Sequence, residues 1–301
     1  MLEAGFILSR FLHYAALLLL FGAALFPFYS WRPGERVPQA TARSLRRALP
    51  LAALVAIVSG AFWFASVVAT MADSPAAALD AASLRMVLLD TDFGRLWSAR
   101  AVLAAILLVC TIGIGAFRRF APRSLLIAGG SALLLASLAL TGHTQAQEGG
   151  TRWLQEGSDG LHLLAAGAWL GGLVPLAIVS RADAPEQAAS ALVRFSGMGY
   201  AAVATLLATG IFNSWLLVGT IDGLVRTSYG LLLLSKVGVF AIMTALAGIN
   251  RLLLVPVLDS TAARGGALGR LRRHIALEQL LGFGAIAVVS VLGTLAPPTA
   301  S

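Results

Sequence analysis

Eight apolar runs, each long enough to cross a lipid bilayer as a helix, constrain the fold of this 301-residue chain more than any other feature. A spanning helix needs about 20 predominantly apolar residues, and a buried soluble helix could imitate one such run but not eight. Only 12% of the residues are charged, whereas soluble domains carry about 25%. The runs are Phe6–Tyr29, Leu49–Met71, Leu96–Phe117, Ser124–Gly142, Gly157–Ser180, Ser196–Val218, Gly230–Pro256 and His274–Ala296. The sequence therefore predicts an all-α integral membrane protein with eight transmembrane helices.

The basic residues are distributed unevenly between the two sets of loops. Of the 22 lysines and arginines, fifteen lie in loops that follow odd-numbered spans and four lie in the opposite loops. Cytoplasmic loops are enriched in basic residues, so this distribution places both termini in the periplasm. The net charge of +8 is thus explained by orientation in a membrane, and it does not indicate a nucleic-acid partner.

The chain also contains a candidate internal repeat. In each half a His is followed nine residues later by a Gly, and a Gly at the start of the third span is followed six residues later by a cation. The paired positions are His13 and Gly22 with His162 and Gly171, and Gly94 and Arg100 with Gly230 and Lys236. The fourth pair of spans matches poorly. We predict two four-helix halves, 1–145 and 146–301, related as a parallel repeat.

Three of the four histidines, His13, His143 and His162, fall toward the outer ends of three different spans in this topology. Ionisable residues inside a membrane usually face the bundle interior or a water-filled cavity, and they mark functional sites. Neutral imidazole is a common ligand of copper, zinc and iron. We predict a shared metal site, with Met71 and Met86 as additional candidate ligands. The alternative is that each His only hydrogen-bonds a neighbouring helix.

Three other charged residues are candidates for a pathway or gate. Arg100 and Lys236 each lie one to two turns inside a span from the outer side, where they either face the interior or extend to the headgroups. Glu278 lies about one turn into the last span from the cytoplasm. It either pairs with Arg251 or Arg273 or serves as an exit for a proton or a metal ion. The sequence lacks a G-x-x-x-x-G-K-[ST] motif, so we expect a non-enzymatic protein whose transport is passive, secondary or partner-driven.

Several stretches together resemble the CopD copper resistance family. The segment from Leu161 to Leu173 reads LHLLAAGAWLGGL, Lys236 is followed by Asn250-Arg251, and the closing part runs through Glu278 to Pro297-Pro298. The resemblance implies a multi-pass protein of the bacterial inner membrane that moves copper from periplasm to cytoplasm. It also implies that the copper residues are His13, His143 and His162, and that a separate CopC-like periplasmic copper-binding protein is a partner.

Two other functions are consistent with the same residues. Membrane four-helix bundles commonly ligate haem b between facing histidines, which suggests an oxidoreductase with His13 and His162 as the axial pair. A copper sensor or assembly factor would bind copper without transporting it. The sequence alone does not decide between these functions and copper import.

Overall fold

The computed structural model describes residues 2–32, 35, 37, 39–112, 121–141, 151–181, 185–259 and 264–300. Regular structure in these ranges is entirely helical, and eight helices are long and apolar enough to cross a membrane. This confirms the predicted all-α membrane fold with eight spans. The spanning segments are α1 (Leu2–Ser30), α2 (Gln39–Met71), α4 (Asp92–Thr111), α5 (Pro122–Ala136) with η2 (Ser137–Thr141), α6 (Thr151–Ala166) with η4 (Gly167–Gly171) and α7 (Gly172–Arg181), α8 (Pro185–Val218), α10 (Ser228–Ile249) with η5 (Asn250–Leu254) and η6 (Pro256–Asp259), and α11 (Arg264–Leu292).

Several helices do not begin and end where the predicted apolar runs begin and end. The runs predicted to begin at Leu49 and Ser196 belong to helices that begin about ten residues earlier, at Gln39 and Pro185. The added turns carry polar and charged side chains, so they extend the helices beyond the apolar layer. In contrast, α4 ends at Thr111, and the remainder of the predicted third run lies among residues 113–120, outside the described ranges.

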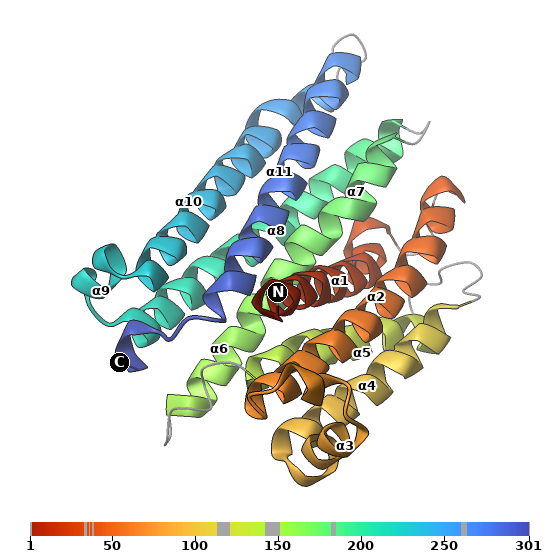
Figure 1. Ribbon diagram of the computed structural model, residues 1–301. Coiled ribbons are helices and arrows are strands. Elements are labelled where there is room, and N and C mark those ends of the chain that lie inside the picture. The colour runs from red at the N-terminus through yellow and green to blue at the C-terminus, as the bar shows by residue number, and fades with distance from the viewer. Residues whose placement is uncertain are drawn as a thin grey trace.

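Two short helices lead into spanning helices at the same end of the bundle. Helix α3 (Ala81–Asp90) precedes α4, and α9 (Ile221–Arg226) precedes α10 (Figure 1). The Thr91 hydroxyl accepts a hydrogen bond from the Gly94 amide at 2.9 Å, and Thr227 accepts one from Gly230 at 3.0 Å. Threonine at the N-cap satisfies an otherwise unpaired amide of the first turn. The Thr-x-x-Gly pattern therefore builds the same corner twice.

Helix α1 lies in the middle of the bundle (Figure 1). It packs against α2 and α5 on one side and against η4, α7 and α11 on the other. A side chain at Gly22 would overlap the backbone of Gly171, so α1 and η4 cross at close range. Small residues permit such crossings between membrane helices. Because α1 contacts elements from both predicted halves, and 142–150 lie outside the described ranges, the division at 145 remains a prediction.

The N-terminal part of α1 is hydrogen-bonded to the segment that follows the last spanning helix. Arg10 Nη1 donates a 2.9 Å hydrogen bond to the Gly293 carbonyl oxygen, just beyond α11. A side chain at Gly293 would collide with the Arg10 guanidinium. The same guanidinium lies 5.1 Å from the centre of the Trp63 ring. These contacts compensate for placing a cation between apolar helices.

Candidate functional site

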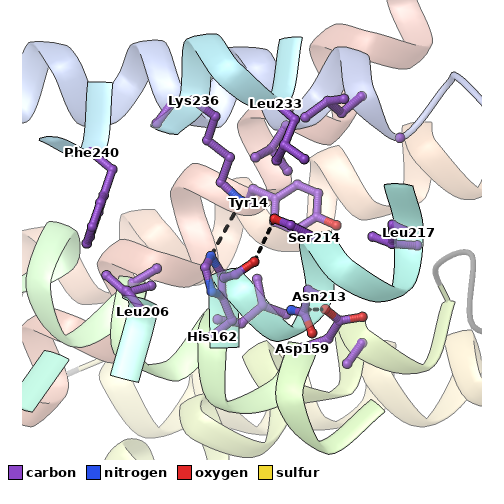
Figure 2. Close-up of a pocket in the computed structure, with 18 of the residues that line it drawn as sticks. Tyr14, Asp159, His162, Leu206, Asn213, Ser214, Leu217, Leu233, Lys236 and Phe240 are labelled. Atoms are coloured by element: carbon purple, nitrogen blue, oxygen red, sulfur yellow. Dashed lines mark hydrogen bonds between the residues drawn. The ribbon is translucent and has the colours of Figure 1, made fainter. Parts of the chain in front are cut away.

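A cavity of about 700 Å³ lies between α1, α6, α8, α10 and α11 (Figure 2). Much of its wall is apolar, as expected inside a membrane bundle. Polar side chains from four helices and from η2 nevertheless line it. They are Arg10, Tyr14, Thr141, Gln155, Asp159, His162, Asn213, Ser214, Tyr229 and Lys236. Polar groups converging on an apolar pocket are the usual features of a ligand site.

His162 is held in one orientation within this cavity. Its Nδ1 lies 2.9 Å from the Thr209 hydroxyl oxygen. That hydroxyl donates its own hydrogen to the Thr205 carbonyl at 2.6 Å, so it accepts from Nδ1–H. The lone pair of His162 therefore resides on Nε2. A metal-binding histidine is commonly fixed in this way, by a hydrogen bond from its other ring nitrogen.

Lys236, the only lysine in the sequence, reaches the same imidazole. Its Nζ lies 3.4 Å from His162 Nε2, and Figure 2 shows the side chain extending from α10 toward α6. The side chain thus enters the cavity and does not extend along the helix to the headgroups. An ammonium group only donates hydrogen bonds, which agrees with a lone pair on Nε2.

Asp159 lies one turn before His162 and also lines the cavity. Its carboxylate accepts a 2.7 Å hydrogen bond from Asn213 Nδ2. The buried Asn213 Oδ1 has no hydrogen-bond partner among the described residues. Neither Asp159 nor Asn213 was predicted from the sequence as a component of the site. The three-residue spacing of Asp159 and His162, which puts both on one helix face, could have indicated the first of them.

His13 shows the same hydrogen-bond pattern in a different setting. Its Nδ1 lies 2.9 Å from the Ala56 carbonyl oxygen, which can only accept, so Nδ1 carries the hydrogen. Nε2 is buried and has no hydrogen-bond partner in the described part of the chain. The ring is packed between Trp63 and Trp97, with centroid distances of 5.5 and 5.8 Å.

Within the described ranges, no three His, Cys, Asp or Glu side chains gather as a metal-binding group. His13 bonds α2, whereas His162 bonds α8 and α10. His143 lies outside the described residues. Met71 and Met86 are exposed, at 60% and 58%, and neither lines the cavity. The shared three-histidine site therefore remains a prediction.

Arg100 is buried and braces two spans. Its Nε donates to the Ser137 hydroxyl at 2.9 Å, and its Nη2 bonds the Ser137 carbonyl and the Thr141 hydroxyl. Its guanidinium also lies 5.3 Å from the centre of the Trp97 ring. Cations near the C-terminal turn of a helix stabilise its unpaired carbonyls. This side chain therefore joins α4 to η2, and it does not line the cavity.

Glu278 forms no ion pair with Arg251 or Arg273, the partners that the sequence suggested. Its Oε1 instead accepts a 2.8 Å hydrogen bond from Asn250 Nδ2, and the carboxyl group lies next to Trp169. Both neighbours are neutral. Asn250 was not predicted from the sequence as part of the site, although a polar residue within an apolar run often marks a functional position.

Comparisons with known proteins agree over nearly the whole chain. The model for the copper resistance protein D-like N-terminal domain matches residues 1–153, and the model for copper resistance protein D matches residues 189–292. The chain is 32% identical to copper resistance protein D of Pseudomonas syringae pv. tomato, over 96% of this chain and 95% of that protein.

Two further relatives are similar over long alignments. The inner membrane protein YebZ of Escherichia coli (strain K12) is 30% identical, with 99% of this chain and 100% of that protein covered. The copper transport protein CutJ of Bacillus subtilis (strain 168) is 29% identical, with 84% of this chain and 47% of that protein covered. No solved structure matches the chain. On the extent of these matches, the chain belongs to the copper resistance protein D family.

Proposed function

We propose that this protein transports copper across the inner membrane, from periplasm to cytoplasm, and so contributes to copper homeostasis or resistance. The observation that carries the proposal is the His162 lone pair, which faces a cavity where polar side chains converge inside an apolar bundle. The names of the relatives from Pseudomonas syringae and Bacillus subtilis indicate copper as the substrate.

The chemistry of the cavity suits capture of a copper ion. Imidazole nitrogen is a suitable ligand for copper, and Thr209 already holds the His162 ring with Nε2 free of hydrogen. A copper ion at Nε2 displaces the Lys236 ammonium, the only group bonded there among the described residues. The Asp159 carboxylate, in the same cavity, supplies negative charge that partly offsets the two cations.

The remaining ligand positions follow the family resemblance. We place His13 and His143 with His162 on the copper route, with both termini in the periplasm. A separate CopC-like periplasmic protein would deliver the ion. Arg100 serves this proposal as the brace that holds α4 against η2, and the exposed Met71 and Met86 are at most transient contacts at the outer surface.

The first test compares purified wild-type protein with His162→Ala and with Cys110→Ser, a conservative control that lies away from the cavity. We measure bound copper by metal analysis, record the absorption spectrum, and follow copper uptake into proteoliposomes. Loss of a principal ligand should lower copper affinity and uptake by at least about 100-fold, equivalent to about 2.7 kcal/mol. Cys110→Ser should behave as wild type.

The other outcomes separate the alternatives. Haem absorbance that disappears with His162 would replace the transporter by a haem b oxidoreductase. Copper binding without uptake would indicate a sensor or an assembly factor. Equal copper content in wild type and His162→Ala would refute the assignment of this residue.

A further inference from the structure

Glu278 on α11 is a carboxyl group buried within the membrane bundle, with 2% of the residue exposed. In the described structure its contacts are with neutral groups, Asn250 and Trp169, and it has no ion-pair partner. A lone negative charge at such a position is very unfavourable, and groups in this situation bind a cation or carry a proton. The two neutral neighbours compensate an anion only in part.

Asn250 connects this carboxyl to the cytoplasmic end of the bundle. Its Nδ2 donates to Glu278, and its Oδ1 lies 2.6 Å from His274 Nδ1. The amide oxygen can only accept, so His274 donates from Nδ1. His274 is partly exposed, one turn before Glu278 on α11. A proton arriving from water at this end therefore has a titratable group beside the buried network.

Trp169 connects the same carboxyl to the cavity. The indole lies next to Glu278 and also forms part of the cavity wall. The titratable groups that line the cavity beyond that wall are Arg10 and Tyr14 on α1, Asp159 and His162 on α6, and Tyr229 and Lys236 on α10. Glu278 thus occupies the position between the copper-binding cavity and the cytoplasmic end.

Both neighbours of Glu278 lie on π-helical turns. Trp169 belongs to η4 and Asn250 to η5, the two such turns in the described chain. Turns of this kind are rare and frequently occur at functional sites, because the extra residue displaces a side chain from the regular helical direction. The presence of two π-helical turns beside one carboxyl group favours a functional role for Glu278.

We propose that Glu278 is a proton-carrying carboxyl group whose proton is bound and released in each transport cycle. This inference rests on the copper transport proposed above. With the cavity empty, the carboxylate oxygen binds one proton taken from water at the cytoplasmic end beside His274. When a copper ion with one positive charge reaches Trp169 from the cavity, the O–H bond breaks and the proton leaves through the cavity to water at the opposite end, so one proton crosses the membrane for each copper ion. The negative charge of the carboxylate is thus compensated in both states, by the proton when the cavity is empty and by the copper ion when it passes.

A first test is independent of copper. Infrared spectra of the wild type at neutral pH should contain a C=O stretching band of a protonated carboxylic acid that is missing in Glu278→Gln. The glutamine keeps the oxygen that accepts from Asn250, so the fold is retained. Glu156→Gln is the matched control, because Glu156 is paired with Arg152 at 2.8 Å and should contribute no such band. Identical wild-type and Glu278→Gln spectra in this region would overturn the proposal.

A second test measures coupling in proteoliposomes that contain a pH-sensitive dye. Copper uptake by the wild type should be accompanied by proton movement. Glu278→Gln should bind copper in detergent within about twofold of wild type, but lose the proton movement and at least about tenfold of the uptake rate. Proton movement that persists in Glu278→Gln would also overturn the proposal. A wild type that binds no copper would instead contradict the copper function, and the infrared result would still decide the state of Glu278.

Discussion

His13 and His162 occupy equivalent positions in the predicted repeat, yet their surroundings differ sharply. Each ring bonds through Nδ1 to the next long helix, close to the glycine at position 60 or 210. The imidazole of His13 is then enclosed by two indole rings. That of His162 faces a cavity of about 700 Å³ and the Lys236 amine.

The cause of this difference can be located in two positions. If the halves are aligned on Gly60 with Gly210, Trp63 corresponds to Asn213. If they are aligned on the glycines at 94 and 230, Trp97 corresponds to Leu233. Both smaller residues line the cavity. In this comparison, the two indoles that enclose His13 correspond to smaller side chains that border the cavity at His162.

The largest expected effect concerns the filled site. Trp63→Ala removes a buried indole that contacts His13 and Arg10. Removal of a large aromatic side chain from a packed interior costs about 3–5 kcal/mol. Unfolding by denaturant in detergent micelles should report a loss of this size, whereas Asn213→Ala at the corresponding hollow position should cost less than about 1 kcal/mol. Similar losses for both variants would break the distinction between filled and hollow sites.

The converse substitution tests the hollow site. Asn213→Trp places an indole in the cavity, as Trp63 does in the other half. We expect copper uptake into proteoliposomes to fall by at least about tenfold, equivalent to about 1.4 kcal/mol, while the protein still folds. Val109→Trp is the control, because this residue is 69% exposed on α4 and the new indole should have no effect there. Uptake that survives in Asn213→Trp would mean that copper does not pass through the cavity.

Lys236 distinguishes the two histidines chemically, since no amine contacts His13 in the described structure. Lys236→Met removes both a competing donor at His162 Nε2 and a positive charge in the cavity. Copper affinity, measured by competition with a chelator, should rise about tenfold. The matched change Arg95→Met, at an exposed residue outside the cavity, should leave copper affinity unaltered. A fall in affinity for Lys236→Met would show that the amine itself assists copper binding.

The smallest effect concerns a contact between Glu35 and Arg194, which lie in the two predicted halves, at the other end of the bundle. Burial alone would raise the pKa of Glu35, but hydrogen bonds from the Arg32 amide and the Arg194 guanidinium hold that pKa below its ordinary value. The contact therefore stabilises the folded protein at pH values above the ordinary pKa of glutamate. This stabilisation is lost as the pH falls through the lowered pKa of Glu35. Since the pair is partly exposed, Glu35→Gln should cost less than about 1 kcal/mol, measured by denaturant unfolding at neutral pH. A larger cost would make this contact a principal link between the halves.

The number of the spans could be predicted because bilayer thickness acts on each segment separately, whereas their direction stays a prediction from loop charge. Side-chain directions could not, because they depend on how the helices rotate against one another. His13 and His162 were both expected near the outer surface, yet only the second lines the cavity. Asp159 lies within the predicted fifth span, but it was not predicted to line the same cavity. Asn250 was not predicted as a site residue, because its hydrogen-bond partner, Glu278, is distant in sequence.

The bond between Arg10 and Gly293 has a consequence for biosynthesis. The first spanning helix enters the bilayer early in translation, with a cation whose carbonyl acceptor lies beyond the last spanning helix. Until that last helix has inserted, Arg10 lacks this acceptor, and a charge without a partner in lipid is costly. Chains that stop before α11 should therefore be held as incomplete intermediates and degraded by membrane proteases. The hydrogen bond between Arg10 and Gly293 therefore forms only after the last spanning helix has inserted.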